Sequence, residues 1–332
     1  MTRIASTLWA PGIEAWRDVR VIDRREHHRL AIGYLVLREA RRHDALVLNG
    51  AARFDELYQD LFAAMALARL RRPPAVVMAE TAWDVGSAKL ARLAGREGFA
   101  FGGAVRAGVR ALDGPHVTYV VFSRDESRHF RELFGVEEDR VRVVLGSHKL
   151  WEHLDAPPPA GDYVFAGGNS LRDWPTLLAA ARAVDAPVRI ATTNPLEGVP
   201  PNVTAGGVSP DEFERLLAGA GPVVVPIRPA PRAAGIDVYL KAMALGKLLI
   251  VSDATAVREY VEDGRTGVVV RPGDPRALAE AMRWATDPAS RAEVDAMRMR
   301  AREQALANHH PNDYWGALRA VADEAAGRRA AQ

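Results

Sequence analysis

The stretch GIDVYLKAMALGKLLIVSD, residues 235–253, decides the fold. Its first part, DVYLKAMALG, has the apolar spacing of a short helix, and LLIVSD is a continuous apolar run that predicts a buried strand. A strand that is apolar on both faces and directly follows a helix is typical of a parallel sheet covered by helices on both sides.

The same alternation extends over the chain in two series. The first has short apolar runs at 45–50, 75–80, 117–123 and 141–146, separated by longer stretches with helical spacing. The second has apolar runs at 162–168, 187–193, 222–227, 248–253 and 266–272, with helices expected at about 173–185, 209–219, 236–246, 254–262 and 275–286. These patterns predict two Rossmann-like, doubly wound parallel-sheet domains, which we expect to face each other across a cleft.

Three consecutive prolines in HLDAPPPAGD interrupt the alternation and are typical of a linker. We therefore predict an N-terminal domain over 1–152, a linker over 153–161 and a C-terminal domain over 162–308. A C-terminal helix is predicted over 309–332, and crossing back to the N-terminal domain is one arrangement open to it. Ligands of such sheets bind at the carboxyl ends of the strands, so residues at those positions are the candidates for a site.

The composition excludes several classes of protein. The chain has 332 residues, 48% of them hydrophobic, with a net charge of +2 and no cysteine. Disulfides and thiolate metal sites are therefore excluded, and a reducing cytoplasm is the expected compartment. No apolar run is long enough to span a bilayer, and no secretory signal is recognised. So small a charge surplus argues against nucleic acid as a partner.

Four blocks of the second half occur in the order of a known family. They are FAGGNSLRDWPTLLAAA (165–181), VVVPIRP (223–229), the opening stretch, and VREYVEDGRTGVVVRPGDPRALAEAM (257–282). Together they resemble the donor-binding domain of the GT-B glycosyltransferases, specifically the retaining family four, the glycosyl transferases group 1. The resemblance implies a GT-B fold and transfer of a sugar from a nucleoside-diphosphate sugar to a hydroxyl acceptor, with retention and without a metal cofactor.

The first block offers a site for the diphosphate of such a donor. Gly167 and Gly168 allow close approach of the backbone, Asn169 and Ser170 can donate hydrogen bonds, and Arg172 is the candidate charged phosphate ligand. The alternative is that the glycines merely form a turn from strand to helix and that Arg172 is a solvated surface group.

The loop that leads into the predicted helix of the opening stretch offers a second phosphate site. Gly235 lets the chain turn, and the N–H groups of Ile236, Asp237 and Val238 would point at the ligand. The alternative is an ordinary helix start that Asp237 caps. Two further donor residues are predicted by their place in the resembling blocks, namely Ile227 and Glu259.

Lys241 departs from the family pattern, which typically has two glutamates where this chain has Ala233 and Lys241. Lys241 has three explanations. It contacts a phosphate, it pairs with Asp237 four residues earlier, or the site has kept only its architecture. We favour an active enzyme with a modified donor pocket and predict catalytic roles for Arg172 and Lys241.

In the first half, strand ends and their loops predict the acceptor site. Its candidates are Gly12, Asn49, Glu80, Trp83 and Asp84. A Trp ring can stack on a sugar, but Trp83 is as well explained as a core residue. Ser123 is interpreted as a helix cap. The expected acceptor is a glycan, a lipid-linked glycan or a small-molecule glycoside.

The histidines indicate no metal site, because His27 with His28 and His309 with His310 are sequence neighbours whose side chains diverge. His148 and His153 are expected to face solvent. The segments 57–72 and 95–112 are apolar and arginine-rich, which is compatible with an anionic membrane surface, but we favour burial against the sheet.

Two alternative functions compete with the leading one. The loss of both glutamates is compatible with a non-catalytic nucleotide- or glycan-binding protein on the same scaffold. A Rossmann-type oxidoreductase is disfavoured, because no G-x-G-x-x-G turn follows a predicted strand. The base, the sugar and the acceptor are not determined by the sequence.

Overall fold

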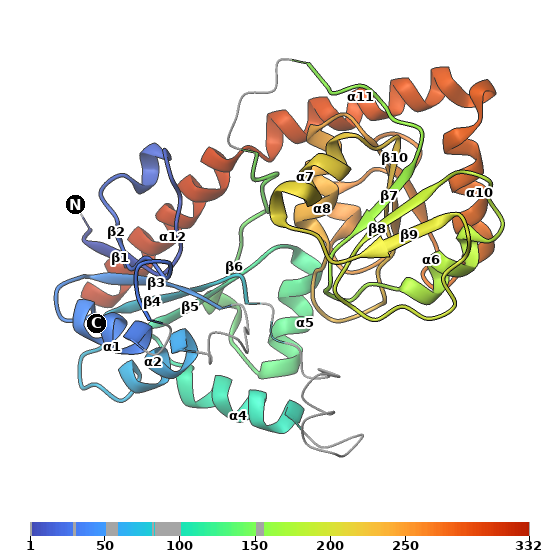
Figure 1. Cartoon of the computed structure of the whole chain (residues 1–332). Helices are drawn as coiled ribbons and strands as arrows, with labels where there is room; N and C mark the ends of the chain where they lie inside the picture. Colours follow the sequence, from blue (N-terminus) through green and yellow to red (C-terminus); the bar gives the residue numbers. More distant parts are fainter. Residues whose placement is uncertain are drawn as a thin grey trace. The chain divides into compact units, whose positions relative to one another are not determined.

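The computed structural model describes residues 2–28, 31–50, 59–81, 83, 101–150 and 156–331. The chain forms two compact units, Met1–Leu145 with Tyr314–Gln332, and Gly146–Asp313 (Figure 1). The final helix therefore belongs to the N-terminal unit, and the first crossing between the units lies a few residues before the predicted linker. The first residues of that linker, up to 155, lie outside the described residues.

The N-terminal unit is built on a six-stranded parallel sheet with the order β2-β1-β3-β4-β5-β6. Its strands are β1 (Ile4–Ser6), β2 (Arg20–Val21), β3 (Ala45–Asn49), β4 (Ala75–Ala79), β5 (Val117–Val121) and β6 (Val141–Val143). Its helices are η1 (Glu14–Trp16), α1 (Ile32–Glu39), α2 (Gln59–Leu67), α4 (Phe101–Leu112), α5 (Arg124–Phe134), η4 (Glu138–Arg140) and α12 (Pro311–Ala330).

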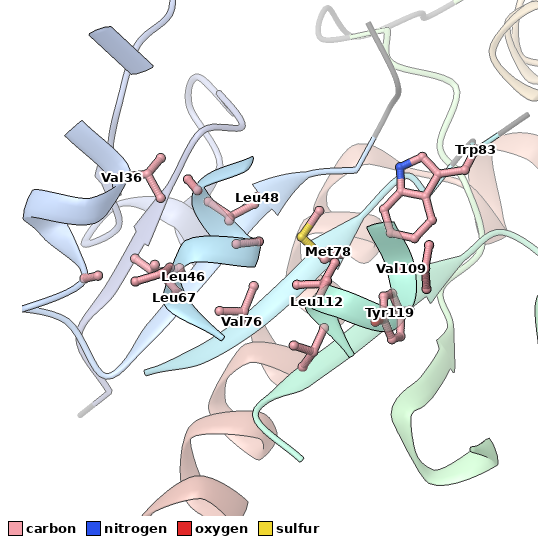
Figure 2. Close-up of a cluster of buried hydrophobic side chains, with 14 of the residues drawn as sticks. Val36, Leu46, Leu48, Leu67, Val76, Met78, Trp83, Val109, Leu112 and Tyr119 are labelled. Carbon is pink, nitrogen blue, oxygen red and sulfur yellow. The ribbon is translucent and has the colours of Figure 1, made fainter. Parts of the chain in front are cut away.

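Both faces of this sheet are buried, as the continuous apolar runs predict. Leu46 and Leu48 of β3 face a cluster that also contains side chains of α1, α2, α4 and α5, and Figure 2 shows part of this cluster. The alternate residues Ala45 and Val47 face the opposite side, where α12 supplies the covering side chains. Trp16 packs there edge-on against Trp315 of α12, with ring centroids 4.9 Å apart.

The C-terminal unit has a second six-stranded parallel sheet, with the order β12-β11-β10-β7-β8-β9. Its strands are β7 (Val164–Gly167), β8 (Val188–Ala191), β9 (Val203–Gly206), β10 (Pro222–Val225), β11 (Leu248–Ser252) and β12 (Val268–Val270). Its helices are α6 (Trp174–Ala181), α7 (Pro210–Ala218), α8 (Ile236–Ala244), α9 (Val257–Tyr260), α10 (Pro275–Thr286), η5 (Pro288–Ser290) and α11 (Arg291–Asn308).

The predicted α/β fold class with two Rossmann-like sheets is confirmed. α6 and α10 cover one face of the second sheet, and α8 with α11 lies on the other. The apolar runs did not reveal β1, β2 and β9. β1 has only three residues, and β2 and β9 are edge strands. The burial of β9 falls from Val203 to an exposed Gly206, so it has no continuous apolar pattern.

Candidate functional site

The first predicted donor segment lies at the carboxyl end of β7. The strand ends at Gly167, and Gly168 continues the chain with a φ of +106°, which L side chains rarely adopt. A Cβ on Gly168 would lie 2.6 Å from Nη2 of Arg172. A glycine is therefore required both for the turn and for the guanidinium that packs on it.

Arg172 is buried, with 5% of its surface exposed. Its Nε donates to the Gly167 carbonyl at 2.8 Å and its Nη1 to the Ser170 carbonyl at 2.8 Å. Burial lowers the pKa of the guanidinium to about 10, against the favourable effect of Asp237. The alternative of a solvated surface group is wrong. The side chain organises the turn that follows β7, and its phosphate role stays a prediction.

Asn169 connects the ends of two neighbouring strands. Its side-chain oxygen accepts from the Thr192 hydroxyl at 2.8 Å and from the Thr193 N–H at 2.9 Å. The side-chain amide of Asn194 donates to the Asn169 carbonyl at 3.0 Å. Asn169 therefore holds the loop after β8 against the loop after β7, and its donor-binding role stays a prediction.

The loop after β10 lies directly against the turn after β7. Nη2 of Arg232 donates to the Ser170 hydroxyl at 2.9 Å, and the Arg228 N–H donates to the Leu171 carbonyl at 2.9 Å. Ile227 is buried and forms an isolated bridge with Arg172. Sequence reasoning left Arg232 unassigned, and the structure assigns it to the joint between the two loops.

The start of α8 forms the second predicted donor segment. Gly235 has a φ of +82°, and a Cβ there would lie 2.9 Å from Cγ1 of Val225 and 3.5 Å from Nη1 of Arg172. Its carbonyl accepts from the N–H groups of Val238 and Tyr239. Among the described residues, no side chain caps this helix, and the N–H groups of Ile236 and Asp237 have no acceptor.

Asp237 is the second residue of α8 and not its cap, so the alternative of an Asp-capped helix start is wrong. Its carboxylate turns along the helix to Lys241, with Oδ2 3.4 Å from Nζ. Lys149 adds a weaker contact, with Nζ 3.8 Å from Oδ1 of Asp237. The amides at the start of α8 are therefore not occupied by their own acidic neighbour.

Lys241 is held by two carboxylates. The predicted pairing with Asp237 is observed, and Nζ also donates to Oε1 of Glu214 on α7. The Lys241 side chain is 11% exposed and that of Glu214 41% exposed. Sequence reasoning missed Glu214, because it lies 27 positions from Lys241 on a different helix. Only the packing of the two helices brings the side chains together.

Ala233 and Glu259 are the two remaining motif positions. Ala233 is buried, and its carbonyl accepts from Nη1 of Arg232 at 3.3 Å. Glu259 is half-buried on α9, and its N–H donates to the Ala256 carbonyl at 3.0 Å. The predicted donor role of Glu259 is neither supported nor contradicted by these contacts.

The expectation that His148 faces solvent is wrong. His148 is 3% exposed, and its Nδ1 accepts from the Leu150 N–H at 3.1 Å. The backbone N–H of His148 donates to the backbone carbonyl of His309. The Nδ1 atom of His309 lies 3.1 Å from the Gly146 carbonyl. Burial, with His310 and His309 nearby, lowers the pKa of His148 to about 4. His153 lies outside the described residues.

Three predicted acceptor residues lie at or near strand ends of the N-terminal unit. Gly12 is exposed with a φ of +72°, and Asn49 ends β3. Glu80 follows β4 with a φ of +57°, which is uncommon for a residue other than glycine and is most often retained at functional sites. Their acceptor role stays a prediction.

Trp83 is corrected from an acceptor residue to a core residue. It is 5% exposed, and its ring lies 5.9 Å from Tyr119 and 5.8 Å from both Phe130 and Phe134 (Figure 2). A ring with these neighbours has no open face for stacking on a sugar. Asp84 lies outside the described residues. Ser123 caps α5 as predicted, accepting from the Glu126 N–H at 2.9 Å.

A buried carboxylate that sequence reasoning missed lies at the carboxyl ends of β1 and β3. Oδ2 of Asp60 accepts from the Thr7 hydroxyl at 2.6 Å and from the Asn49 N–H at 2.8 Å, and it lies 2.6 Å from the Arg24 guanidinium. Burial raises the pKa of Asp60 despite these donors. The group joins α2 to two strand ends.

A hollow of about 600 Å³ lies elsewhere in the C-terminal unit, lined by Asp162, Asp185, Leu248, Asp287, Arg291 and Asp295 among others. These residues surround the amino ends of the strands, opposite to the predicted donor residues, so it is not the predicted donor site. Within the described part of the chain, no group of three or more acidic or histidine residues could hold a metal ion. None of the described helices is both long and apolar enough to cross a membrane.

Comparison with known protein families shows what the C-terminal unit is similar to. A family model described as "Glycosyl transferases group 1" matches residues 169–287, which contain most of the donor segments described above. The predicted resemblance to this glycosyltransferase family is therefore confirmed over this part of the C-terminal unit. No curated protein sequence matches the chain.

Solved structures with the same fold cover nearly the whole chain. A glycosyltransferase from Rickettsia africae ESF-5 is 12% identical with a TM-score of 0.63, covering 98% of this chain and 90% of its own. Anabaena Alr3699/HepE in complex with UDP-glucose is 15% identical with a TM-score of 0.67, covering 98% and 100%. WaaG, involved in lipopolysaccharide biosynthesis, is 14% identical with a TM-score of 0.61, covering 96% and 99%.

Proposed function

We propose that the protein transfers a sugar from a nucleoside-diphosphate sugar to a hydroxyl group of a glycan, lipid-linked glycan or small-molecule glycoside, with retention of the anomeric configuration. The observation that carries the proposal is the start of α8, where the N–H groups of Ile236 and Asp237 have no acceptor among the described residues. The buried guanidinium of Arg172 lies against the same turn. The GT-B neighbour that was crystallised with UDP-glucose supports this class of donor.

The diphosphate would lie between the turn after β7 and the start of α8. Backbone N–H groups at a helix N-terminus bind phosphate oxygens, and the helix dipole favours their negative charge. Two of the three guanidinium nitrogens of Arg172 are bound to carbonyls, which orients the group before the ligand arrives. A preorganised cation of this kind stabilises the charge that grows on the departing phosphate.

Lys241 would act through the two carboxylates that it holds. A carboxylate at the first turn of α8 would repel a diphosphate, and pairing with Lys241 draws Asp237 away and neutralises it. The same ammonium orients Glu214, whose partly exposed carboxylate can accept hydrogen bonds from donor hydroxyls. We propose that Glu214 replaces in part the acids that are missing at Ala233 and Lys241.

No metal ion is needed for this mode of diphosphate binding, because the helix start and Arg172 supply the positive potential. We therefore propose metal-independent transfer in the cytoplasm. Activity measured after EDTA treatment should equal activity with added Mg²⁺ or Mn²⁺. A strict requirement for either ion would contradict this part of the proposal.

A panel of UDP-, GDP- and dTDP-sugars tests the donor class, with thermal shift as the binding readout and release of nucleoside diphosphate as the activity readout. At least one donor should stabilise the protein, and Arg172→Ala should abolish that shift. Arg182→Ala is the matched control, since Arg182 is an exposed arginine at the far end of α6. Absence of a shift with every nucleotide would overturn the proposal. Retention is read from the anomeric signal of the product by NMR.

A non-catalytic nucleotide-binding protein is the second candidate. The observation that favours it is the position of Lys241, bound to two carboxylates at a place where the family typically has a glutamate. This candidate predicts a clear thermal shift with one nucleotide and neither transfer nor hydrolysis of the sugar. Release of the nucleoside diphosphate in the presence of an acceptor excludes it.

A further inference from the structure

The loop after β1 in the N-terminal unit presents a tryptophan to solvent. Leu8 and Ala10 are each 8% exposed and belong to the core that α12 covers, whereas Trp9 between them is 48% exposed. Tryptophan is highly buried on average, so an exposed one calls for an explanation. The buried neighbours fix the backbone on both sides of Trp9, and the ring could turn inward only if they left the core. Packing of the sheet therefore does not account for the position of this ring.

A guanidinium group covers one face of the Trp9 ring. Cζ of Arg25, in the turn after β2, lies 3.9 Å from the ring centroid. Asp23 fixes this group, because its carboxylate accepts from Nε of Arg25 at 2.9 Å and from Nη2 at 2.5 Å. These bonds hold the pKa of Asp23 at about 2, so the ion pair persists at neutral pH. No ring of the described residues lies against the opposite face of Trp9.

The turn that carries this arginine is anchored from the inside as well. The guanidinium of Arg24 lies 2.6 Å from Oδ2 of Asp60, the buried carboxylate that also accepts from the Thr7 hydroxyl. Thr7 is two residues before Trp9, so one carboxylate ties the loop after β1 to the turn after β2. The two segments follow strands that pair in parallel. The ring and its guanidinium are therefore held in place before any ligand arrives, which lowers the entropic cost of binding.

Trp9, Arg25 and Asp23 together form what we call the Trp9 platform, and it lies at the carboxyl edge of the first sheet. The same edge holds the predicted acceptor residues Gly12, three positions after Trp9, and Asn49 at the end of β3. Ligands of parallel α/β sheets bind at this edge. The platform is therefore part of the surface on which we expect the acceptor.

An aromatic face with hydrogen-bond donors at its rim suits a sugar ring. One face of a pyranose presents C–H groups, whose small positive charge matches the negative face of the indole ring. The hydroxyls around the sugar need donors and acceptors. The indole N–H of Trp9 and Nη1 of Arg25 form no hydrogen bond with another residue that the structure describes, so both can donate to these hydroxyls.

Other ligands fit the Trp9 platform less well. An alkyl chain would cover the two donors without offering an acceptor, which costs free energy. A planar base also stacks on tryptophan, but the predicted donor segments, which would bind the nucleotide, belong to the C-terminal unit. We propose that the Trp9 platform stacks on a pyranose ring of the acceptor and so selects a carbohydrate over a non-sugar alcohol. This inference rests on the proposed function, because it names the chemistry of its acceptor.

Binding of simple sugars to the full-length protein without a donor tests the proposal. The probes are the methyl glycosides of glucose, galactose, mannose and N-acetylglucosamine, followed by saturation-transfer and titration NMR. At least one should bind, and Trp9→Ala should weaken it about tenfold or more, because the apolar contact is lost. Trp9→Phe keeps an aromatic face and should stay within about threefold of the wild type. Binding of none of the sugars, or equal binding by wild type and Trp9→Ala, overturns the proposal.

Leu70→Ala is the matched control for loss of an exposed apolar side chain. Leu70 is 49% exposed and lies in the segment that leads into β4, at the amino edge of the same sheet. The prediction that the segment 57–72 buries its apolar residues against the sheet is therefore wrong for Leu70, and also for Phe62, which is 58% exposed. Leu70→Ala should leave sugar binding within about twofold. A loss equal to that of Trp9→Ala would indicate a non-specific effect and would overturn the proposal.

Arg25→Ala tests whether the guanidinium positions the ring. Sugar binding should weaken about threefold, since the ring loses the group that orients it. The indole N–H signal of Trp9 in ¹⁵N spectra, assigned by its loss in Trp9→Phe, should move. Arg17→Ala is the control, because Arg17 is also an exposed arginine of this unit that pairs with an acid, Glu14. If both variants leave sugar binding and the indole signal unchanged, the platform does not exist as proposed.

Nucleotide binding separates this inference from the proposed function. Trp9→Ala should leave the thermal shift with nucleotides unchanged, and in the transfer assay it should raise the acceptor KM but not the donor KM. Loss of the nucleotide shift would mean that the ring stacks on the donor base and would overturn the inference. Sugar binding without binding of any nucleotide would contradict the proposed function alone. Nucleotide binding without sugar binding would contradict the inference alone.

Discussion

The starts of α6 and α8 both lie at the carboxyl edge of the same sheet and near Arg172, yet in the part of the chain that the structure describes only α6 has a side-chain cap. α6 begins after Asp173, whose carboxylate accepts from the Thr176 N–H at 3.3 Å and from the Thr176 hydroxyl at 2.7 Å. α8 begins after Gly235, and no side chain among the described residues caps it. α7 and α10 resemble α6, with Ser209 and Asp274 as their caps.

At the start of α6, a side chain of the protein accepts a hydrogen bond from a free N–H group. At the start of α8, the free N–H groups have no such acceptor among the residues that the structure describes and remain available to a ligand. A helix start has N–H groups that need acceptors, and a side-chain cap supplies them at the expense of an external anion. The predicted phosphate site after β7 therefore depends on Arg172 and the turn rather than on the amides of α6. The start of α8 is the better anion site, because its neighbouring acid, Asp237, is bound to Lys241.

The largest effect is expected for Arg172→Ala, which removes the cation that lies beside both helix starts. Loss of one preorganised donor typically costs about 10²- to 10³-fold in turnover. The carbonyls of Gly167 and Ser170 lose their donor, so stability should also fall by about 1–3 kcal/mol. Steady-state kinetics and urea unfolding measure the two effects, with Arg182→Ala as control. Unchanged donor kinetics would remove the guanidinium from the mechanism.

A smaller effect is expected for Gly235→Ala, which perturbs α8 and leaves α6 intact. The positive φ costs about 1–2 kcal/mol with a Cβ, and the new atom would lie close to Val225. Because the amides of Ile236 and Asp237 would shift, the donor KM should rise roughly tenfold or more. Gly264→Ala is the matched control, since Gly264 also has a positive φ but a Cβ added to it would meet no heavy atom within 4 Å. Equal donor KM values in the two variants would contradict the assignment of α8.

Lys241→Met tests whether the lysine works by neutralising Asp237. The freed carboxylate should turn towards the helix start and repel the diphosphate, which we expect to weaken nucleotide binding about tenfold. Asp237→Asn in the same protein should restore much of that loss, because the amide carries no charge. The double-mutant cycle is measured by isothermal titration with the nucleoside diphosphate. Additive effects would show that the lysine acts on the donor by another route.

The smallest effect on the donor is expected for Asp173→Ala at the start of α6. Loss of the cap should destabilise the protein by about 1 kcal/mol, seen as a lower urea midpoint. The donor KM should stay within about twofold of the wild-type value, because Asp173 already uses the amide that it caps. A large rise in KM with little change in stability would mean that α6 takes part in donor binding after all.

The sequence predicted most of the strands and the second-half helices, and it also predicted that the proposed donor segments follow the carboxyl ends of strands. This was possible because strands buried on both faces are apolar throughout, and glycines with positive φ have few substitutes. Asp173, Ser209 and Asp274 stand where the cap rules expect an acceptor. β1 and the edge strands β2 and β9 escaped detection, since all three are short and β2 and β9 are also largely exposed.

Contacts between distant residues were not predictable from the chain alone. Glu214 meets Lys241 only because α7 and α8 pack on the same face of the sheet, and Trp83 is in the core only because α5 covers it with Phe130 and Phe134. From the sequence alone, an Asp or Glu side chain can equally be a helix cap, an ion-pair partner or a ligand-binding group. Which of these roles it has depends on which atoms lie within about 3 Å of its carboxylate. Backbone preferences and burial patterns depend on individual residues and their neighbours in the chain, and they can therefore be predicted from the amino-acid sequence. Burial of Arg172, release of the α8 amides and exposure of Phe62 depend on packing between elements, and only the folded chain decides them.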